Sequence, residues 1–268
     1  MAAALDLVAG WPVPSAAVAV PSPGGVLAAT GGDTAYPWAS VTKLVTALTV
    51  LTAVDRGEAG LDEPAGPPGA TLRHLLAHAS GLAPDGDQVL APPGRRRIYY
   101  NRGIEVAAAL VAKRTGTDFG QLLGERVLGP LGMTGTVLDG SPAHGARGPI
   151  DDLARLGREL LAPTLVPGLM AEATRPVFPG LAGVLPGFGR QDPNDWGLGF
   201  ELRDGKSPHW TGARNSPATF GHFGQSGSFL WADPVRPLAL AGLADRPFGA
   251  WAVQAWPSLS DAVIAQFG

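Results

Sequence analysis

The spacing of hydrophobic residues changes twice along this chain of 268 residues. Apolar runs of strand length, bounded by Pro and Gly, lie near both ends, in SAAVAVPSPGGVLAATGG (15–32) and ATFGHFGQSGSFLWADP (218–234). Between about residues 40 and 161 the apolar positions instead recur at helical spacing. The pattern therefore predicts strands at both ends of the chain and a helical middle.

The short connections between the terminal strands favour antiparallel pairing. We therefore predict an α+β protein in which helices flank an antiparallel sheet and a helical subdomain is inserted between its strands. Residues 1–39 and 194–268 are predicted to form a discontinuous sheet domain and residues 40–193 the helical subdomain, with the active site between them. Residues 163–193 are rich in Pro and Gly, which predicts irregular surface structure and a candidate lid over a cleft.

One predicted helix carries an unexpected charge. Within residues 34–54 the only charged side chain is Lys43, and the apolar residues of this segment cover every face of the helix. Such a helix is predicted to be buried all round. Pro37 and Ser40 mark its expected start, with Ser40 as the N-cap. Lys43 is then disfavoured as a cation both by burial and by the positive end of the helix dipole.

Ser40 and Lys43 are three residues apart, so they share one face of the helix. Because burial and the dipole both favour the neutral amine, Lys43 is predicted to lose its proton more easily than a surface lysine. A neutral amine beside a serine hydroxyl makes a nucleophile. The simpler alternative is an N-cap serine followed by a lysine whose amine reaches water.

Composition excludes several classes of function. Charged residues make up 16% of the chain and the formal net charge is -3, so a nucleic-acid partner is not indicated. There is no cysteine, which excludes disulfides and thiolate nucleophiles. A secretory signal would begin with a Lys- or Arg-containing region, but residues 1–42 contain neither residue. No apolar run is long enough to span a membrane. The sequence predicts a cytoplasmic protein without a membrane partner, a metal or a cofactor.

A second candidate motif follows the run of arginines at 95–97. Tyr99, Tyr100 and Asn101 stand directly before a predicted helix, so Asn101 could be its N-cap and one of the two tyrosines is expected to pack in the core. The arginines 95–97 are predicted to form a solvated loop, although on the rim of a cleft they would attract carboxylates.

Among the five histidines, His222 is a further candidate for the substrate site, and one pair only resembles a zinc site. His222 is followed by Gly224 in a strand pattern, where a glycine often marks the close approach of a ligand, and such a strand can offer N–H groups to an oxyanion. His74 and His78 have the helical spacing of two zinc ligands, but the Glu of H-E-x-x-H is absent, so a structural or exposed pair is predicted. His144 and His209 lie in predicted loops, with no partner that the sequence identifies.

Taken in order, these motifs resemble the serine β-lactamase and penicillin-binding-protein superfamily, especially its class C-like branch. Ser40-Val41-Thr42-Lys43 is similar to the family's S-x-x-K, Tyr99-Tyr100-Asn101 to its Y-x-N, and His222-Phe223-Gly224 to the H-x-G that replaces K-T-G in some members. Three further segments resemble family signatures, namely LLAHASGL (75–82), VLGPLGM (127–133) and WGLGF (196–200). The resemblance therefore spans nearly the whole chain.

The resemblance implies an acyl-enzyme cycle. Ser40 would attack a carbonyl carbon, Lys43 with Tyr99 would accept its proton, and Tyr99 would pass a proton to the leaving group. The oxyanion would lie between the backbone N–H groups of Ser40 and Gln225. Asn101 would orient the substrate carbonyl.

The third motif completes the substrate site that the resemblance implies. His222 and Gly224 would line it, whereas His78 looks structural by the same comparison. Phe223 replaces the hydroxyl residue usual in this motif and His222 replaces the lysine. These departures weaken the carboxylate-binding features associated with penicillin recognition.

The combined observations favour a serine hydrolase that acts on small esters or amides. The first alternative is a β-lactamase or DD-peptidase, and the second is a non-catalytic binding protein on the same fold. The expected partner is a small-molecule ester, amide or lactam. The sequence does not indicate the oligomeric state.

Overall fold

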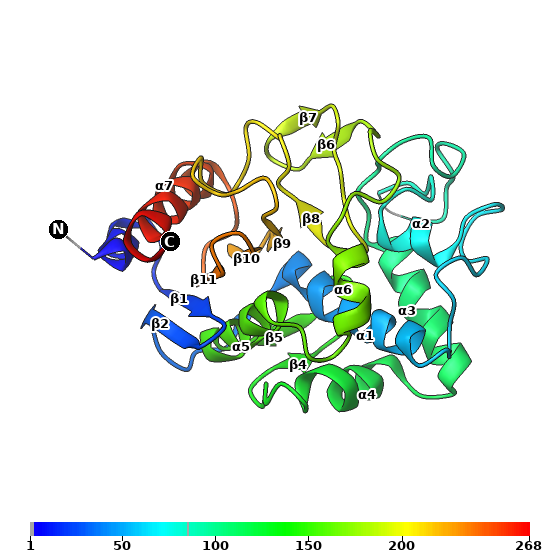
Figure 1. Cartoon of the computed structure of the whole chain (residues 1–268), viewed down its shortest axis with the longest axis horizontal. Coiled ribbons are helices and arrows are strands. Elements are labelled where there is room, and N and C mark those ends of the chain that lie inside the picture. The colour runs from blue at the N-terminus through cyan, green and yellow to red at the C-terminus, as the bar shows by residue number, and fades with distance from the viewer. Residues whose placement is uncertain (1–2, 85) are drawn as a thin grey trace.

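A six-stranded antiparallel sheet forms the centre of one half of the molecule (Figure 1). The computed structural model describes residues 3–84 and 86–268. In spatial order the strands are β2 (Gly25–Thr30), β1 (Ala16–Ser22), β11 (Leu238–Ala244), β10 (Ser228–Asp233), β9 (Phe220–Gly224) and β8 (Glu201–Leu202). The first strand of the chain, β1, thus pairs directly with its last strand, β11, and β2 lies at the edge of the sheet. The predicted α+β fold, with an antiparallel sheet flanked by helices, is confirmed.

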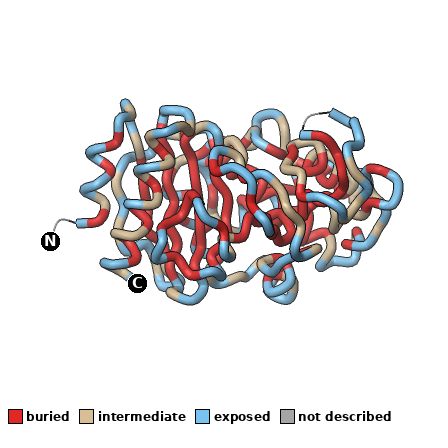
Figure 2. The backbone as a smooth tube through the Cα atoms, turned by 90° about the horizontal axis from the view of Figure 1, so that it is seen from above, coloured by how far each residue is buried: buried red, intermediate tan, exposed pale blue. Residues whose placement is uncertain are grey.

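Helices cover both faces of this sheet, which explains why its central strands are almost entirely apolar. On one face Val18, Phe229 and Trp231 pack with the 3₁₀-helix η1 (Ala4–Gly10) and with α7 (Ala250–Phe267). The side chains between them, such as Ala17 and Leu230, point to the opposite face and join the core of the helical half. Strands buried on both faces read as continuous apolar runs. Figure 2 shows these central strands as buried along most of their length.

The other half of the molecule is mainly helical. Its elements are α1 (Thr42–Asp55), α2 (Leu72–Leu76), α3 (Arg102–Thr115), α4 (Phe119–Leu123), the π-turn η3 (Gly124–Leu128), α5 (Ile150–Leu161) and α6 (Pro167–Ala173). Short strands interrupt it: β5 (Ala146–Gly148) pairs with both β3 (Tyr36–Pro37) and β4 (Val137–Leu138), and β6 (Gly183–Leu185) pairs with β7 (Gly189–Gln191). Helix α5 packs against β1 and β11 of the large sheet. The division into a sheet domain and a helical subdomain at residues 39 and 193 stays a prediction.

Helix α1 runs through the middle of the molecule, as Figure 1 shows. Every residue of 42–53 is buried, Lys43 included, so the predicted all-round burial is confirmed. The predicted N-cap is wrong, because Ser40 lies inside a 3₁₀ turn, η2 (Ala39–Val41), and its hydroxyl caps no backbone N–H. That hydroxyl is instead occupied by two other side chains.

Among the described residues no helix combines the length and the apolar character that a membrane crossing needs. The cytoplasmic location stays a prediction.

Candidate active site

The position of Ser40 is fixed by the short segment that precedes it. The Trp38 side chain is fully buried, and its indole N–H donates to the carbonyl of Gly148 at 3.2 Å. The backbone N–H of Trp38 donates to Ala146 O at 2.8 Å. Ala39 then takes a φ of +44°, a region costly for a residue with a Cβ, and this turns the chain into η2. Ser40 therefore stands on a rigid, sharply turned junction between β3 and the buried helix α1.

Two side chains converge on the Ser40 hydroxyl. The Lys43 Nζ lies 3.2 Å from Ser40 Oγ, and the Tyr99 hydroxyl donates to the same oxygen at 2.7 Å. Burial raises the pKa of Tyr99, so its phenol keeps its proton and acts as a donor. Lys43, three residues after Ser40, and Tyr99, from the distant Y-x-N motif, thus both contact Ser40 Oγ.

The surroundings of Lys43 suit a neutral amine. Its Nζ lies 2.7 Å from Asn101 Oδ1 and 3.0 Å from the carbonyl oxygen of Ala143. Both partners are acceptors, so they use the two N–H groups of a neutral amine and leave its lone pair for the Ser40 hydroxyl. Burial lowers the pKa of Lys43 to about 7, against a smaller opposing effect of Glu105. The alternative of a lysine reaching water is excluded, because its side chain is fully buried.

The two adjacent tyrosines have different surroundings. Tyr100 is 1% exposed, and its hydroxyl donates to the carbonyls of His74 and Leu75 at 3.1 and 3.0 Å. Tyr99 instead faces Ser40, and its ring packs against His78 and Trp196, with ring centroids 4.8 and 5.6 Å away. One tyrosine is therefore a core residue, as predicted, and the other belongs to the site.

The turn between β9 and β10 lies against the segment that carries Ser40. Ser228 Oγ donates to Trp38 O at 2.6 Å, and Ser226 Oγ donates to Pro37 O at 2.7 Å. Gly224 fits between them without a side chain, because an added Cβ would lie 2.4 Å from Trp38 O. Within the described part of the chain, the backbone N–H of the next residue, Gln225, donates to no acceptor. An available N–H group therefore lies on the lining of the pocket that Ser40 also lines.

His222 is a neutral imidazole with a defined tautomer. Its Nδ1 lies 2.6 Å from the carbonyl of Phe223, so Nδ1 carries the proton and Nε2 is left as an acceptor. Burial, with a smaller effect of Lys43, lowers the pKa of His222 to about 3. Phe223 packs with Phe248 and Trp256 between the sheet and α7. The second position of this motif is therefore filled by a core side chain.

The sequence matches the Beta-lactamase family over residues 6–262. This chain belongs to the β-lactamase family. A crystal structure of a β-lactamase from Mycobacterium bovis is 54% identical, covers 98% of this chain and 99% of its own, and superposes with a TM-score of 0.97. The predicted relationship to the serine β-lactamase and penicillin-binding-protein superfamily is confirmed.

Other solved structures share the fold of this β-lactamase-family chain at low sequence identity. Unliganded simvastatin synthase from Aspergillus terreus has a TM-score of 0.80 at 18% identity and covers 98% of this chain and 96% of its own. EstCE1, a hydrolase with promiscuous acyltransferase activity, has a TM-score of 0.79 at 18% identity, with 97% and 96% covered. Protein Rv1367c of Mycobacterium tuberculosis is 29% identical over the matched segment, and this segment covers 39% of that relative, so only about two fifths of it is matched.

Three expectations about individual residues of this β-lactamase-family chain are wrong. His74 and His78 do not share a helix, because α2 ends at Leu76 and His78 lies beyond it with a φ of +54°. His209 has a partner after all, since its Nε2–H donates to Glu201 Oε2 at 2.9 Å. Arg97 is no solvated loop residue: its guanidinium is buried and donates to four backbone carbonyls, those of Ala77, Val177, Phe178 and Asn194.

The sequence reasoning missed a buried charged cluster at the wall of the site, and one of its members, Glu201, lines the same pocket as Ser40. Glu201, on β8, is 1% exposed and accepts from Lys206, from His209 and from the indole of Trp210. Although burial alone raises the pKa of a carboxyl, Lys206 and His209 lower that of Glu201 to about 2. The Lys206 Nζ also lies 6.0 Å from the ring centroid of Trp196. One signal was available, because Glu201 is a charged residue directly after the apolar WGLGF segment.

Glu201→Gln is expected to lower the free energy of unfolding by about 3 kcal/mol or more, because Lys206 stays buried without a carboxylate partner. Urea denaturation at pH 7 measures the loss. Since the folded pKa of Glu201 is about 2 and its ordinary value is 4.5, the wild type should lose this contribution as the pH falls from about 4.5 to 2. The control is Asp87→Asn, which breaks the exposed pair with Arg102 and should cost at most about 1 kcal/mol. Equal losses in both variants would contradict the assignment.

Proposed function

We propose that this protein is a serine hydrolase that forms an acyl-enzyme on small esters or amides, with Ser40, Lys43 and Tyr99 as its catalytic residues. The proposal rests on the contacts that Lys43 and Tyr99 both make with the Ser40 hydroxyl. Ser40 Oγ lies 3.2 Å from an amine whose pKa is lowered to about 7 and 2.7 Å from a phenol that keeps its proton. An activated nucleophile requires a base within hydrogen-bond reach, and the leaving group requires an acid.

In the proposed cycle the Ser40 hydroxyl gives its proton to the Lys43 amine as Oγ bonds to the substrate carbonyl carbon. The backbone N–H groups of Ser40 and Gln225 stabilise the oxyanion that forms. Tyr99 then donates its proton to the departing oxygen or nitrogen as that bond breaks, and the Lys43 ammonium returns a proton to Tyr99. Water repeats the sequence on the ester of Ser40, which releases the acid and restores the enzyme.

The third motif favours esters over penicillin-like lactams. His222 is neutral and Phe223 lies in the core, so neither supplies the cation or the hydroxyl that would hold a carboxylate next to the scissile bond. Asn101 Oδ1 is bound to Lys43, and we place its amide nitrogen toward the substrate carbonyl. The second candidate, a β-lactamase, is favoured by the 54% identity to the Mycobacterium bovis β-lactamase.

A fluorophosphonate label followed by intact mass and peptide mapping tests the proposal. One label is expected per chain, on Ser40 alone, and none on Ser40→Ala. The same preparation should turn over a p-nitrophenyl ester with at least tenfold higher kcat/KM than a chromogenic cephalosporin. A label that persists in Ser40→Ala would refute the nucleophile. Cephalosporin turnover near about 10⁶ M⁻¹s⁻¹, a value typical of dedicated enzymes, would decide for the β-lactamase alternative.

A further inference from the structure

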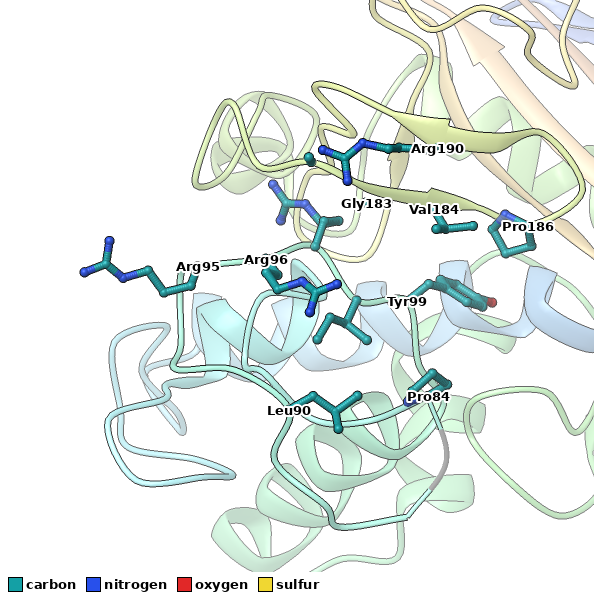
Figure 3. A pocket seen from close by; sticks show the side chains of 12 residues that line it. Pro84, Leu90, Arg95, Arg96, Tyr99, Gly183, Val184, Pro186 and Arg190 are labelled. Carbon is teal, nitrogen blue, oxygen red and sulfur yellow. The ribbon is translucent and has the colours of Figure 1, made fainter.

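A large cavity of about 680 Å³ adjoins the small pocket that contains Ser40, and Tyr99 and Pro186 line both (Figure 3). One wall is the chain segment 95–99 that leads into the Y-x-N motif. The other wall is the β6–β7 hairpin, which contributes Gly183, Val184, Pro186 and Arg190. The cavity therefore borders the proposed catalytic pocket at Tyr99 and Pro186.

The lining of this cavity changes character with distance from the catalytic pocket. Pro84, Val184 and the adjacent residue Ile98 make apolar surface near Tyr99, and Leu90 continues this surface toward Arg96. Figure 3 shows Arg95, Arg96 and Arg190 on the side of the cavity opposite the Tyr99 hydroxyl, with Arg95 pointing outward and Arg96 pointing back toward Tyr99. A cavity with an apolar stretch and a basic end fits an elongated molecule whose charged group lies far from the scissile carbonyl.

The guanidinium groups of Arg95, Arg96 and Arg190 are less occupied by contacts within the protein than the guanidinium group of Arg97. Within residues 3–84 and 86–268, the guanidinium groups of Arg95 and Arg96 form no ion pair. Arg190 contacts Asp192 through one nitrogen at 3.0 Å, and both side chains of this pair are mostly exposed, so the pair is weak. The nearby acidic residue Asp87 does not line this cavity, and it is bound to Arg102. The basic end therefore retains positive charge.

We propose that this cavity binds the remote end of the substrate and that this end carries an anionic oxygen group, a carboxylate or a phosphate, held by Arg95, Arg96 and Arg190. The inference rests on the proposed function, because it assigns the substrate class of the same Ser40 site. Guanidinium groups hold carboxylates and phosphates through paired N–H groups. The apolar stretch between Tyr99 and the arginines then contacts the linker of the substrate.

The position of the charge distinguishes this substrate class from a cephalosporin. In a cephalosporin the carboxylate stands beside the lactam, and the neutral His222 of the third motif offers it no cation. In the proposed substrates the anion is separated from the scissile carbonyl by an apolar chain. The enzyme should therefore disfavour substrates with an anion beside the scissile carbonyl, such as cephalosporins, and favour substrates with an anion at the remote end.

Two matched series of p-nitrophenyl and phenyl esters test the proposal. In one series the end of a linear acyl chain carries a carboxylate, a phosphate or a neutral methyl ester, and in the other the far end of the leaving group carries the same three groups. At low ionic strength at least one anionic member is expected to exceed its neutral counterpart at least tenfold in kcat/KM, and salt should reduce this ratio. The carboxylate and phosphate arms decide which anion is preferred.

The variants assign the preference to the arginines. Replacing Arg95 and Arg96 together by Gln, or Arg190 by Gln, should lower the ratio of anionic to neutral kcat/KM about tenfold, while Lys at 95 and 96 should retain part of it. The control is Arg214→Gln, which removes one positive charge at an exposed position outside the cavity and should leave the ratio unchanged. A ratio near one in both series, or an equal loss in Arg214→Gln, overturns the proposal.

Binding to Ser40→Ala separates this inference from the proposed function. Isothermal titration of that variant with the anionic and neutral esters needs no turnover, so it reports on the cavity even if no ester is hydrolysed. Tighter binding of the anionic ester, lost with Gln at 95 and 96, supports the cavity assignment by itself. Equal binding of both esters overturns it, whatever Ser40 does.

Discussion

Lys43→Arg is expected to lower kcat for a p-nitrophenyl ester by about 1,000-fold or more, nearly as much as Lys43→Ala. The proposed role requires an amine that gives up its proton, and a guanidinium stays protonated in proteins. A positioned general base contributes about 100- to 10,000-fold, and this one also orients Asn101. Steady-state kinetics of the three proteins at pH 8 measure the effect.

The pH profile provides an independent check on the same residue. Burial lowers the pKa of Lys43 to about 7, so the neutral amine forms as the pH rises through that value. The wild-type kcat/KM should therefore increase between about pH 6 and 8 with an inflection near 7. His222, with a pKa of about 3, and Tyr99, whose pKa is raised, do not titrate in this range. A flat profile would contradict the assignment.

Folding must be separated from chemistry in these variants, because Arg is larger than the space that Lys43 fills. Lys43→Met has a similar volume without a titratable group, and it should lose activity as strongly as Lys43→Ala. Thermal unfolding and circular dichroism identify any variant that fails to fold. If a folded Lys43→Arg protein retains the wild-type kcat, Lys43 supplies only positive charge and the general-base proposal is wrong.

The fold and the order of the motifs could be predicted because both depend on local patterns. Continuous apolar runs gave the terminal strands, since β1, β10 and β11 are covered on both faces. A lone lysine within an apolar helix pointed to the Ser40 region because burial of an amine is costly whatever surrounds it. Such signals need no knowledge of distant parts of the chain.

Features that depend on long-range contacts could not be predicted. The burial of Arg97 follows from four carbonyls, three of them 80 or more residues away, and nothing near it in the sequence indicates them. The Ala143 carbonyl that accepts from Lys43 is 100 residues distant and carries no side-chain signal. The N-cap error has a similar cause, because the hydroxyl of Ser40 is bound by Tyr99 from a distant loop.

Tyr99→Phe is expected to lower kcat by about 100-fold or more with a much smaller change in KM. The substitution removes a hydroxyl that donates to Ser40 Oγ at 2.7 Å and that, in the proposed cycle, gives its proton to the leaving group. Loss of a positioned acid acts on the transition state more than on substrate binding, so kcat and kcat/KM should fall together. The ring remains, so its packing against His78 and Trp196 is retained.

The adjacent tyrosine provides the matched control. Tyr100→Phe removes a hydroxyl that donates to the carbonyls of His74 and Leu75, away from Ser40. This variant should keep kcat within about threefold of the wild type while losing about 1 kcal/mol of unfolding free energy, the usual contribution of a buried hydrogen bond. The two changes are chemically identical and one residue apart, so only orientation distinguishes them. Equal losses of kcat in both variants would refute the placement of Tyr99 as the acid.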